Sequence, residues 1–131
     1  MKNKIATDLE QSKKLAEILP IESADMVLPF RHLKNDEYIL GYAVSRNYVE
    51  VYNEMMTLPA MEKEDVYKLI QPAWSLAALL NVLPKIHGLK PILDLEECSI
   101  QYSGIDLYIT ANNPTDACCE MILKLKEENL L

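Results

Sequence analysis

Several carboxylates gather in the last third of the chain, and their type and spacing come nearest to a catalytic or metal-binding set. Asp94, Glu96 and Glu97 precede a segment of alternating residues, and Asp106 lies beyond it. Two carboxylates held close together can act as general acid and base or bind a divalent cation. If the hairpin predicted over residues 92–109 brings Asp94, Glu96 and Asp106 together, the chain is a small-molecule binder or a weak hydrolytic enzyme.

The other reactive residue types lack partners at the spacing that such sites need. Neither His32 nor His87 has a cysteine or a second histidine at metal-ligand spacing. Cys118 and Cys119 are adjacent, so on a helix they point about 100° apart and do not form an ordinary disulfide. All three glycines are isolated, which excludes a glycine-rich phosphate loop, and no serine stands in a nucleophile elbow. We therefore expect no catalytic residue, no metal and no cofactor.

Length, composition and charge are those of one acidic globular domain. The chain has 131 residues, of which 50% are hydrophobic, enough for a single domain with one core. Its net charge of −7 argues against a non-specific nucleic-acid binder, which needs a basic surface, although an acidic nucleic-acid mimic is a third reading. No apolar run reaches the roughly 18–20 residues of a membrane span or resembles a signal peptide. Together with cysteines that we expect to serve as small apolar side chains in a reducing compartment, these features predict a cytoplasmic protein.

One helix is predicted before the middle part of the chain and another after it. Thr7 and Glu10 have the spacing of a capping box at the start of the first helix, which should end near Pro20. Ser75 is a capping residue for a second helix over residues 76–83, in the densest apolar run of the chain. A start at Pro72, with this proline in the first helical position, is an alternative. Small uncharged residues oppose its leucines, so we expect this helix to be the most buried one.

The last helix should begin at Asn113, a capping side chain, with Pro114 in the first helical position. Its buried stripe is predicted to consist of Ala117, Cys118, Met121, Ile122 and Leu125. Cys119 and Leu123 fall on the opposite, outer side of the helical wheel. A thiol and a leucine there make a small candidate contact surface.

Two runs of strand-forming residues predict a first hairpin. Residues 38–44 and 48–52 are the strands, and residues 45–47 suit a three-residue loop. Tyrosines line one side of this hairpin. Tyrosine suits a partly solvent-exposed surface, such as a ligand site, a dimer interface or the outer face of a sheet. These tyrosines are Tyr38, Tyr42, Tyr48 and Tyr52. Residues 62–70 could form a short helix.

A second hairpin is predicted from strict alternation. Apolar residues occupy every second position of residues 98–102 and 105–109, and Ser103 and Gly104 form the turn. Placing Tyr102 opposite Ile105 puts all the apolar residues on one face. The same register pairs Asp106 with a glutamine on the solvent face, as is typical of an ordinary solvent-exposed sheet surface.

Four blocks of the sequence resemble a family of small uncharacterised proteins of phages, prophages and mobile elements of gut anaerobic bacteria. The blocks are TDLEQSKKL at residues 7–15, SADM at 23–26, PAWSL at 72–76, and NPTDAC at 113–118 with EMI at 120–122. Residues 27–71 lie outside the resemblance. The resemblance implies an intracellular accessory role and no particular activity or ligand.

These patterns predict a single α+β domain over residues 1–131. A mainly antiparallel sheet of about four strands in two hairpins should carry three principal helices packed on it. The predicted core comprises Leu9, Leu19, Leu40, Trp74, Leu76, Leu79, Leu80, Leu83, Ile100, Leu107, Met121, Ile122 and Leu125.

The function that we expect is that of a non-enzymatic accessory protein of a phage or mobile element that acts through protein–protein interaction. Its partner is another protein or a second copy of the chain, and neither nucleic acid nor membrane is expected to bind. The candidate interaction surface comprises Tyr38, Tyr42, Tyr48, Tyr52, Cys119 and Leu123.

Overall fold

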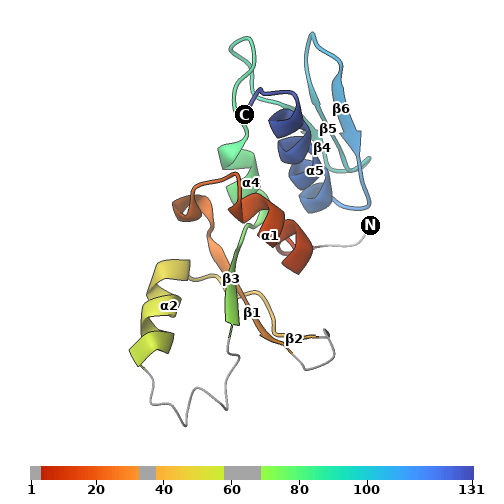
Figure 1. Ribbon diagram of the computed structural model, residues 1–131. Helices are drawn as coiled ribbons and strands as arrows, with labels where there is room; N and C mark the ends of the chain where they lie inside the picture. Colours follow the sequence, from red (N-terminus) through yellow and green to blue (C-terminus); the bar gives the residue numbers. More distant parts are fainter. Residues whose placement is uncertain (1–3, 33–37, 58–68) are drawn as a thin grey trace. The chain divides into compact units, whose positions relative to one another are not determined.

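The chain is an α+β protein that divides into two compact units (Figure 1). The computed structural model describes residues 4–32, 38–57 and 69–131. Residues 8–74 form one unit, here called the N-terminal unit, and residues 1–7 with 75–131 form the C-terminal unit. The described strands make two three-stranded antiparallel sheets, one in each unit, instead of one sheet of about four strands. None of the described helices has the length and apolar character needed to cross a membrane.

The N-terminal unit contains a sheet in the order β2-β1-β3. Its elements are α1 (Leu9–Ala16), the 3-10 turn η1 (Ile21–Ser23), β1 (Met26–His32), β2 (Tyr38–Leu40), α2 (Tyr48–Thr57) and β3 (Leu69–Ala73). Helix α1 packs against β3, and the Lys13 ammonium lies 5.7 Å from the centre of the Phe30 ring on β1. Helix α2 packs against β1 and β3.

A capping box begins α1 one residue later than the sequence predicts. The Asp8 carboxylate accepts the Gln11 amide hydrogen at 2.8 Å, and the Gln11 side chain accepts the Asp8 amide hydrogen at 3.0 Å. The prediction of Thr7 with Glu10 is therefore wrong. Thr7 and Asp8 are both suitable capping residues, and Glu10 and Gln11 are their possible partners three positions later. The sequence therefore allows two capping boxes that differ by one position.

A proline lies in the central strand β1, and it is the reason why the sequence did not predict this strand. The Pro29 carbonyl accepts a hydrogen bond from the Gly41 amide at 2.8 Å, so the proline nitrogen also faces β2, where it has no hydrogen to donate. Val44 lies four positions after Leu40, but their partners on β1, Val27 and Phe30, are only three positions apart. The partner chain therefore bulges by one residue beside Pro29, a position where a strand tolerates proline.

The predicted first hairpin is wrong in its second half, because residues 48–57 form helix α2. The Asn47 side chain accepts the Glu50 amide hydrogen at 3.2 Å, as a helix cap does. Four of the five residues Tyr-Val-Glu-Val-Tyr are strand formers, but Tyr48, Val51 and Met55 have helical spacing. These three side chains are the half-buried ones of α2.

Two further predictions in this unit differ from the structure. Leu40, expected in the core, is 47% exposed on β2, which among the described strands pairs with β1 alone and forms an edge of the sheet. Leu69 and Ile70, expected at the end of a helix, belong to β3. The rest of that predicted helix, residues 62–68, lies outside the described residues.

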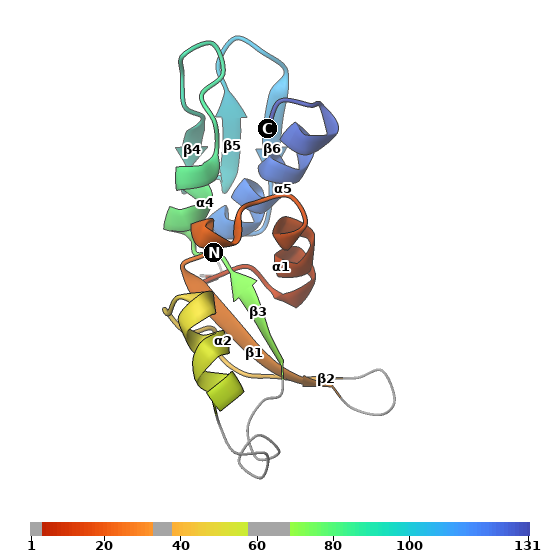
Figure 2. The ribbon, with the colours of Figure 1, turned by 60° about the vertical axis from the view of Figure 1, so that its left-hand side comes forward.

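The C-terminal unit contains a meander in the order β4-β5-β6 (Figure 2). Its elements are α4 (Leu76–Val82), β4 (Ile92–Asp94), β5 (Ser99–Tyr102), β6 (Leu107–Thr110) and α5 (Pro114–Glu127). Helix α5 packs against β5, β6 and α4. The predicted caps are confirmed: the Ser75 hydroxyl accepts the Ala78 amide hydrogen, and the Asn113 side chain accepts that of Asp116.

The register of the second hairpin is shifted by two residues from the prediction. Tyr102 pairs with Leu107 and Ile100 with Ile109, and residues 103–106 form a four-residue turn. A shift of two residues leaves every side chain on its expected face, because side chains alternate with a period of two. Asp106 consequently lies in the turn and does not pair with Gln101, whose partner is Tyr108.

Helix α5, not α4, is the most buried of the described helices. All five residues of its predicted stripe are buried, together with Thr115 and Cys119. In α4 only Ala78 and Leu79 are buried, whereas Leu76 and Leu80 are half-buried. The dense apolar run identified a helix correctly but overestimated its burial.

Candidate functional site

The carboxylates that could do chemistry are not brought together. The Asp94 side chain accepts the amide hydrogens of Glu96 and Glu97 at 3.0 and 3.1 Å, which closes the turn between β4 and β5. Asp106 lies in the turn between β5 and β6. These two turns are at opposite ends of β5. The hydrolytic alternative therefore lacks the convergence of Asp94, Glu96 and Asp106 on which it depended.

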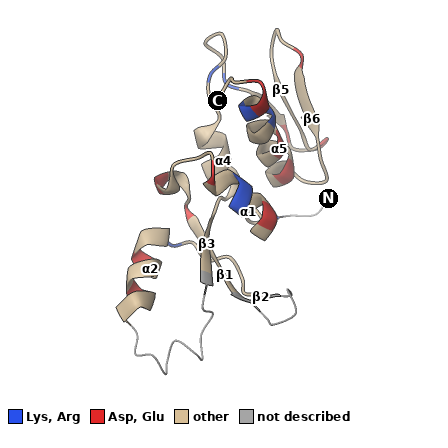
Figure 3. Cartoon of the chain, in the orientation of Figure 1, with Lys and Arg blue, Asp and Glu red and all other residues tan. Residues whose placement is uncertain are grey.

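Metal-binding groups are not assembled in the described part of the chain. No three His, Cys, Asp or Glu side chains of those residues lie close enough together to hold a metal ion. Figure 3 shows acidic positions on α1, α2 and α5, so the negative charge is not gathered on one element.

The cysteines are buried thiols and not contact residues. Cys119 is fully buried, so its predicted place on an outer surface is wrong. The reason is that α5 packs against two strands on one side and against α4 on another, which covers more of the helix than one stripe. Leu123, the other member of that predicted surface, is half-buried.

We expect these thiols to be protected from modification in the folded protein. Cys98, Cys118 and Cys119 are at most 6% exposed, and burial raises the pKa of Cys118 to about 12, so little reactive thiolate forms at neutral pH. Titration with an aromatic disulfide reagent should modify all three thiols within minutes in denaturant and at least a hundredfold more slowly without it. Rapid native modification of Cys118 would contradict this burial.

The predicted tyrosine surface is distributed over two kinds of element. Tyr38 is in β2, and Tyr42 follows this strand with 93% of its surface exposed. Tyr48 and Tyr52 are one helical turn apart on α2 and stack, with ring centres 6.1 Å apart. Burial, followed by the charge of Tyr52, raises the pKa of Tyr48. The structure thus pairs two of the four tyrosines on one helix face.

Apolar side chains cover a wider arc of α2 than the arc that packs against β1 and β3. Val49, Tyr52 and Met56 are 47%, 46% and 58% exposed. They stand at positions i, i+3 and i+7, so at about 100° per residue they form one stripe along the helix. We call these three residues the α2 stripe. It lies beside the half-buried face of Tyr48, Val51 and Met55 and extends the apolar arc of the helix into solvent.

The remaining side of α2 is polar. It carries Glu50, Asn53, Glu54 and Thr57, all exposed. Arg46, just before the helix, binds both carboxylate oxygens of Glu54 at 2.6 and 2.9 Å. The hydrogen bond with Glu54 raises the pKa of Arg46, and the same bond lowers that of Glu54. At about 100° per residue, this charged pair lies on the side of α2 opposite the α2 stripe, and the uncharged Asn53 is the polar residue next to the stripe.

Exposed apolar side chains continue in the segment that precedes α2. Four of them lie in or just after β2, namely Ile39, Leu40, Tyr42 and Val44. With the α2 stripe they make seven exposed large apolar residues within residues 39–56. Single exposed apolar residues are common on any protein, and a contact surface is indicated by a contiguous patch such as the α2 stripe, not by density along the sequence.

A pocket of about 260 Å³ lies in the C-terminal unit between three turns. One wall is a two-residue turn in which His87 and Gly88 both have positive φ angles and Ile86 and Leu89 exchange two backbone hydrogen bonds. A second wall is the β5–β6 turn with Ile105.

The third wall of this pocket is the end of α5. Asn129 takes the left-handed conformation, and the Leu130 amide donates to the Leu125 carbonyl at 2.8 Å. The Asn129 amide donates to the Lys126 carbonyl, which completes a Schellman motif. This motif folds Leu130 back over the pocket.

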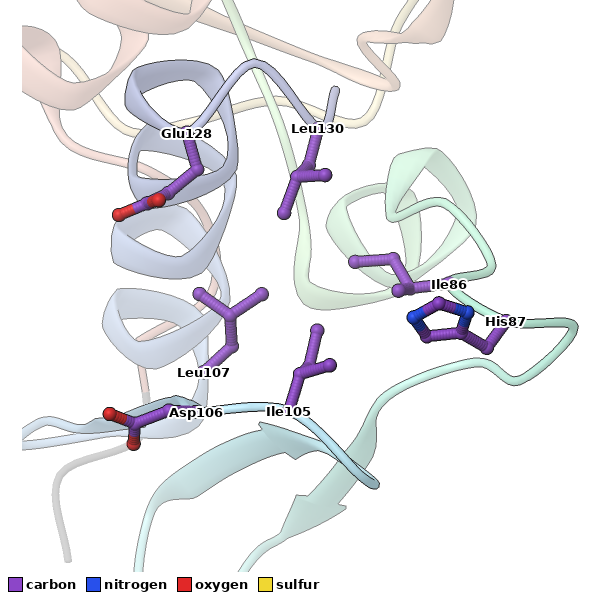
Figure 4. Close-up of a pocket in the computed structure, with 7 residues that line it drawn as sticks. All are labelled: Ile86, His87, Ile105, Asp106, Leu107, Glu128 and Leu130. Carbon is purple, nitrogen blue, oxygen red and sulfur yellow. The ribbon is translucent and has the colours of Figure 1, made fainter.

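The pocket has an aliphatic centre and polar edges (Figure 4). Ile86, Ile105, Leu107 and Leu130 converge on its middle, as the view shows. The His87 ring lies on one side of them, and the carboxylates of Asp106 and Glu128 lie on the other. The sequence does not predict this pocket, because about 20 residues of the chain separate each wall from the next. The His-Gly pair is the one local signal of a turn.

Comparison of the chain with protein-family models, with curated proteins and with solved structures finds no match.

Proposed function

We propose that this chain is a non-enzymatic binding protein that acts through protein–protein contact made by the α2 stripe. The observation that carries the proposal is that Val49, Tyr52 and Met56 extend the apolar arc of α2 beyond its packed face. An amphipathic helix with an uncovered apolar stripe binds partners by burying that stripe. The phage or mobile-element accessory role implied by the sequence resemblance is compatible with such a contact and remains part of the proposal.

The composition of the stripe supports a protein partner. Tyrosine is enriched in the energetic centres of interfaces, and methionine adapts its shape to irregular surfaces.

The test compares two double variants of α2. Val49→Ala with Met56→Ala shortens the stripe, whereas Glu50→Ala with Asn53→Ala makes matched changes on the polar side. Both use alanine, the best helix former, at exposed positions, so folding should be retained. Light scattering over a concentration series detects self-association, and affinity capture from the organism that carries the gene, followed by reconstitution with the purified partner, detects a heterologous contact.

We expect the stripe variant to weaken binding at least tenfold and the polar-side variant to change it less than threefold. Equal binding by both variants would contradict the proposal. A chain that is monomeric at all concentrations, and from which no partner reconstitutes, would also contradict it. Concentration-dependent dimers that require the stripe would identify the partner as a second copy.

A further inference from the structure

We propose that the pocket of the C-terminal unit is a binding site for a small organic ammonium compound with an aliphatic or aromatic body. The inference is independent of the proposed function, since it concerns the unit that does not contain α2. It is carried by the pairing of a hydrophobic centre with two carboxylates on one side of the same pocket.

The walls of the pocket are preformed by backbone hydrogen bonds. The His87–Gly88 turn is closed by bonds of 2.9 and 3.1 Å between Ile86 and Leu89, and the Schellman motif holds Leu130 by a bond of 2.8 Å. Tyr102 donates its hydroxyl hydrogen to the Pro84 carbonyl at 2.7 Å, which ties the strand β5 to the segment leading into the first turn. A ligand therefore orders few side chains on binding, which lowers the entropic cost.

The size of the pocket sets the size of the ligand. A buried cavity of about 150 Å³ accepts benzene. At about 260 Å³ this pocket accommodates one ring, or a chain of about six carbons, with a terminal polar group. It lies at the small end of ligand pockets, so a fragment-sized compound with roughly millimolar to submillimolar affinity is expected.

Charge selects the polar group of that ligand. The Asp106 and Glu128 carboxylates line the pocket on the same side and are both exposed. Glu128 also lies 3.5 Å from the Lys124 ammonium, but an exposed pair of this kind contributes little, so a cation at the rim can replace Lys124 beside Glu128. Two negative charges repel a carboxylate or phosphate group and attract an ammonium. The aliphatic side chains Ile86, Ile105, Leu107 and Leu130 then cover the ligand's apolar body.

The test is a titration of the full chain at low salt, monitored by heteronuclear NMR. The probes are hexylamine, hexanol and hexanoate, which share one apolar body and differ in charge. We expect saturable shifts at the methyl groups of Ile86, Ile105, Leu107 and Leu130, with hexylamine binding five- to tenfold more tightly than hexanol and hexanoate more weakly still. Because exposed charges are screened, this preference should shrink at high salt.

Variants separate the two parts of the proposed site. Asp106→Asn with Glu128→Gln should reduce the preference for hexylamine over hexanol to about one, whereas Glu97→Gln with Glu120→Gln, which removes two exposed charges that do not line the pocket, should leave it intact. Leu130→Ala should weaken all three probes. The proposal is overturned if no probe gives saturable shifts up to its solubility limit, or if the amine preference survives the loss of both rim carboxylates.

Discussion

Replacing Trp74 by alanine should destabilise the N-terminal unit by about 3–5 kcal/mol, the usual cost of removing a fully buried large aromatic side chain. Trp74 is completely buried, and its indole Nε1 donates to the Ser23 hydroxyl at 2.9 Å. That hydroxyl in turn donates to the Pro20 carbonyl at 2.6 Å. Since a whole domain is stable by only about 5–15 kcal/mol, the alanine variant should unfold at far lower urea concentration than the parent chain. Far-ultraviolet circular dichroism measures this, because Trp74 is the only tryptophan and the variant has no tryptophan fluorescence.

Two milder variants separate packing from hydrogen bonding at the same position. Trp74→Phe keeps most of the apolar volume but cannot donate to Ser23, and Ser23→Ala removes the hydroxyl that accepts from the indole. Each should cost about 1–2 kcal/mol, and the double variant should cost less than the sum. Strict additivity would show that the bond between Trp74 and Ser23 contributes nothing, and a cost below 1 kcal/mol for Trp74→Ala would contradict the burial of the indole.

Local signals in the sequence were sufficient for the helices that begin with a capping side chain. Ser75 and Asn113 were predicted as caps and act as caps, because a cap depends on residues only two or three positions away. The buried stripe of α5 was predicted for the same reason, since helical spacing alone selects it. Cys119 was misplaced because its burial depends on what packs against α5, and spacing within the helix does not contain that information.

Non-local structure was where prediction failed. Residues 48–52 fit both a strand and a helix, and only the residues as far as Met56 favour the helical period. The strand β1 was missed because a central strand normally excludes proline, and the bulge that accommodates Pro29 is formed by residues more than ten positions away. In the second hairpin, alternation determined the face of each residue but not the turn length, so the register could slip by two.

For the candidate sites too, local signals predicted part of the arrangement and non-local structure could not be predicted. The tyrosines stand out by their number, and Tyr48 and Tyr52 do share a helix face. Val49 and Met56 join Tyr52 in one stripe only in a helix, whereas the sequence predicts a strand that ends at Tyr52. The pocket joins His87, Asp106 and Leu130 through three separate turns, an arrangement that no local pattern predicts.

Alkaline pH should destabilise the C-terminal unit well before the chain loses its other interactions. Burial raises the pKa of Cys118 from 9.0 to about 12, and burial, followed by the charge of Cys118, raises that of Tyr102 from 10.0 to about 12. Both groups are neutral when protonated, and the folded state holds their protons more tightly than the unfolded state does. Their stabilising contribution is therefore complete below pH 9 and is lost as the pH rises from 9 to 12. At about 1.4 kcal/mol per unit of pKa shift, the two interacting groups together account for on the order of a few kcal/mol.

Urea unfolding at intervals from pH 7 to pH 11.5, in the presence of a reductant, measures this loss. Tyr102→Phe should cost about 1 kcal/mol at pH 7, because the bond to the Pro84 carbonyl is lost, yet its stability should fall less steeply above pH 10 than that of the parent chain. Cys118→Ala should flatten the decline from pH 9 upward. The matched control is Tyr108→Phe, which changes an exposed tyrosine on the neighbouring strand and should leave the pH dependence unaltered. If Tyr102→Phe and Tyr108→Phe decline in parallel, ionisation of Tyr102 is not what opens this core, and the alkaline transition begins elsewhere in the unit.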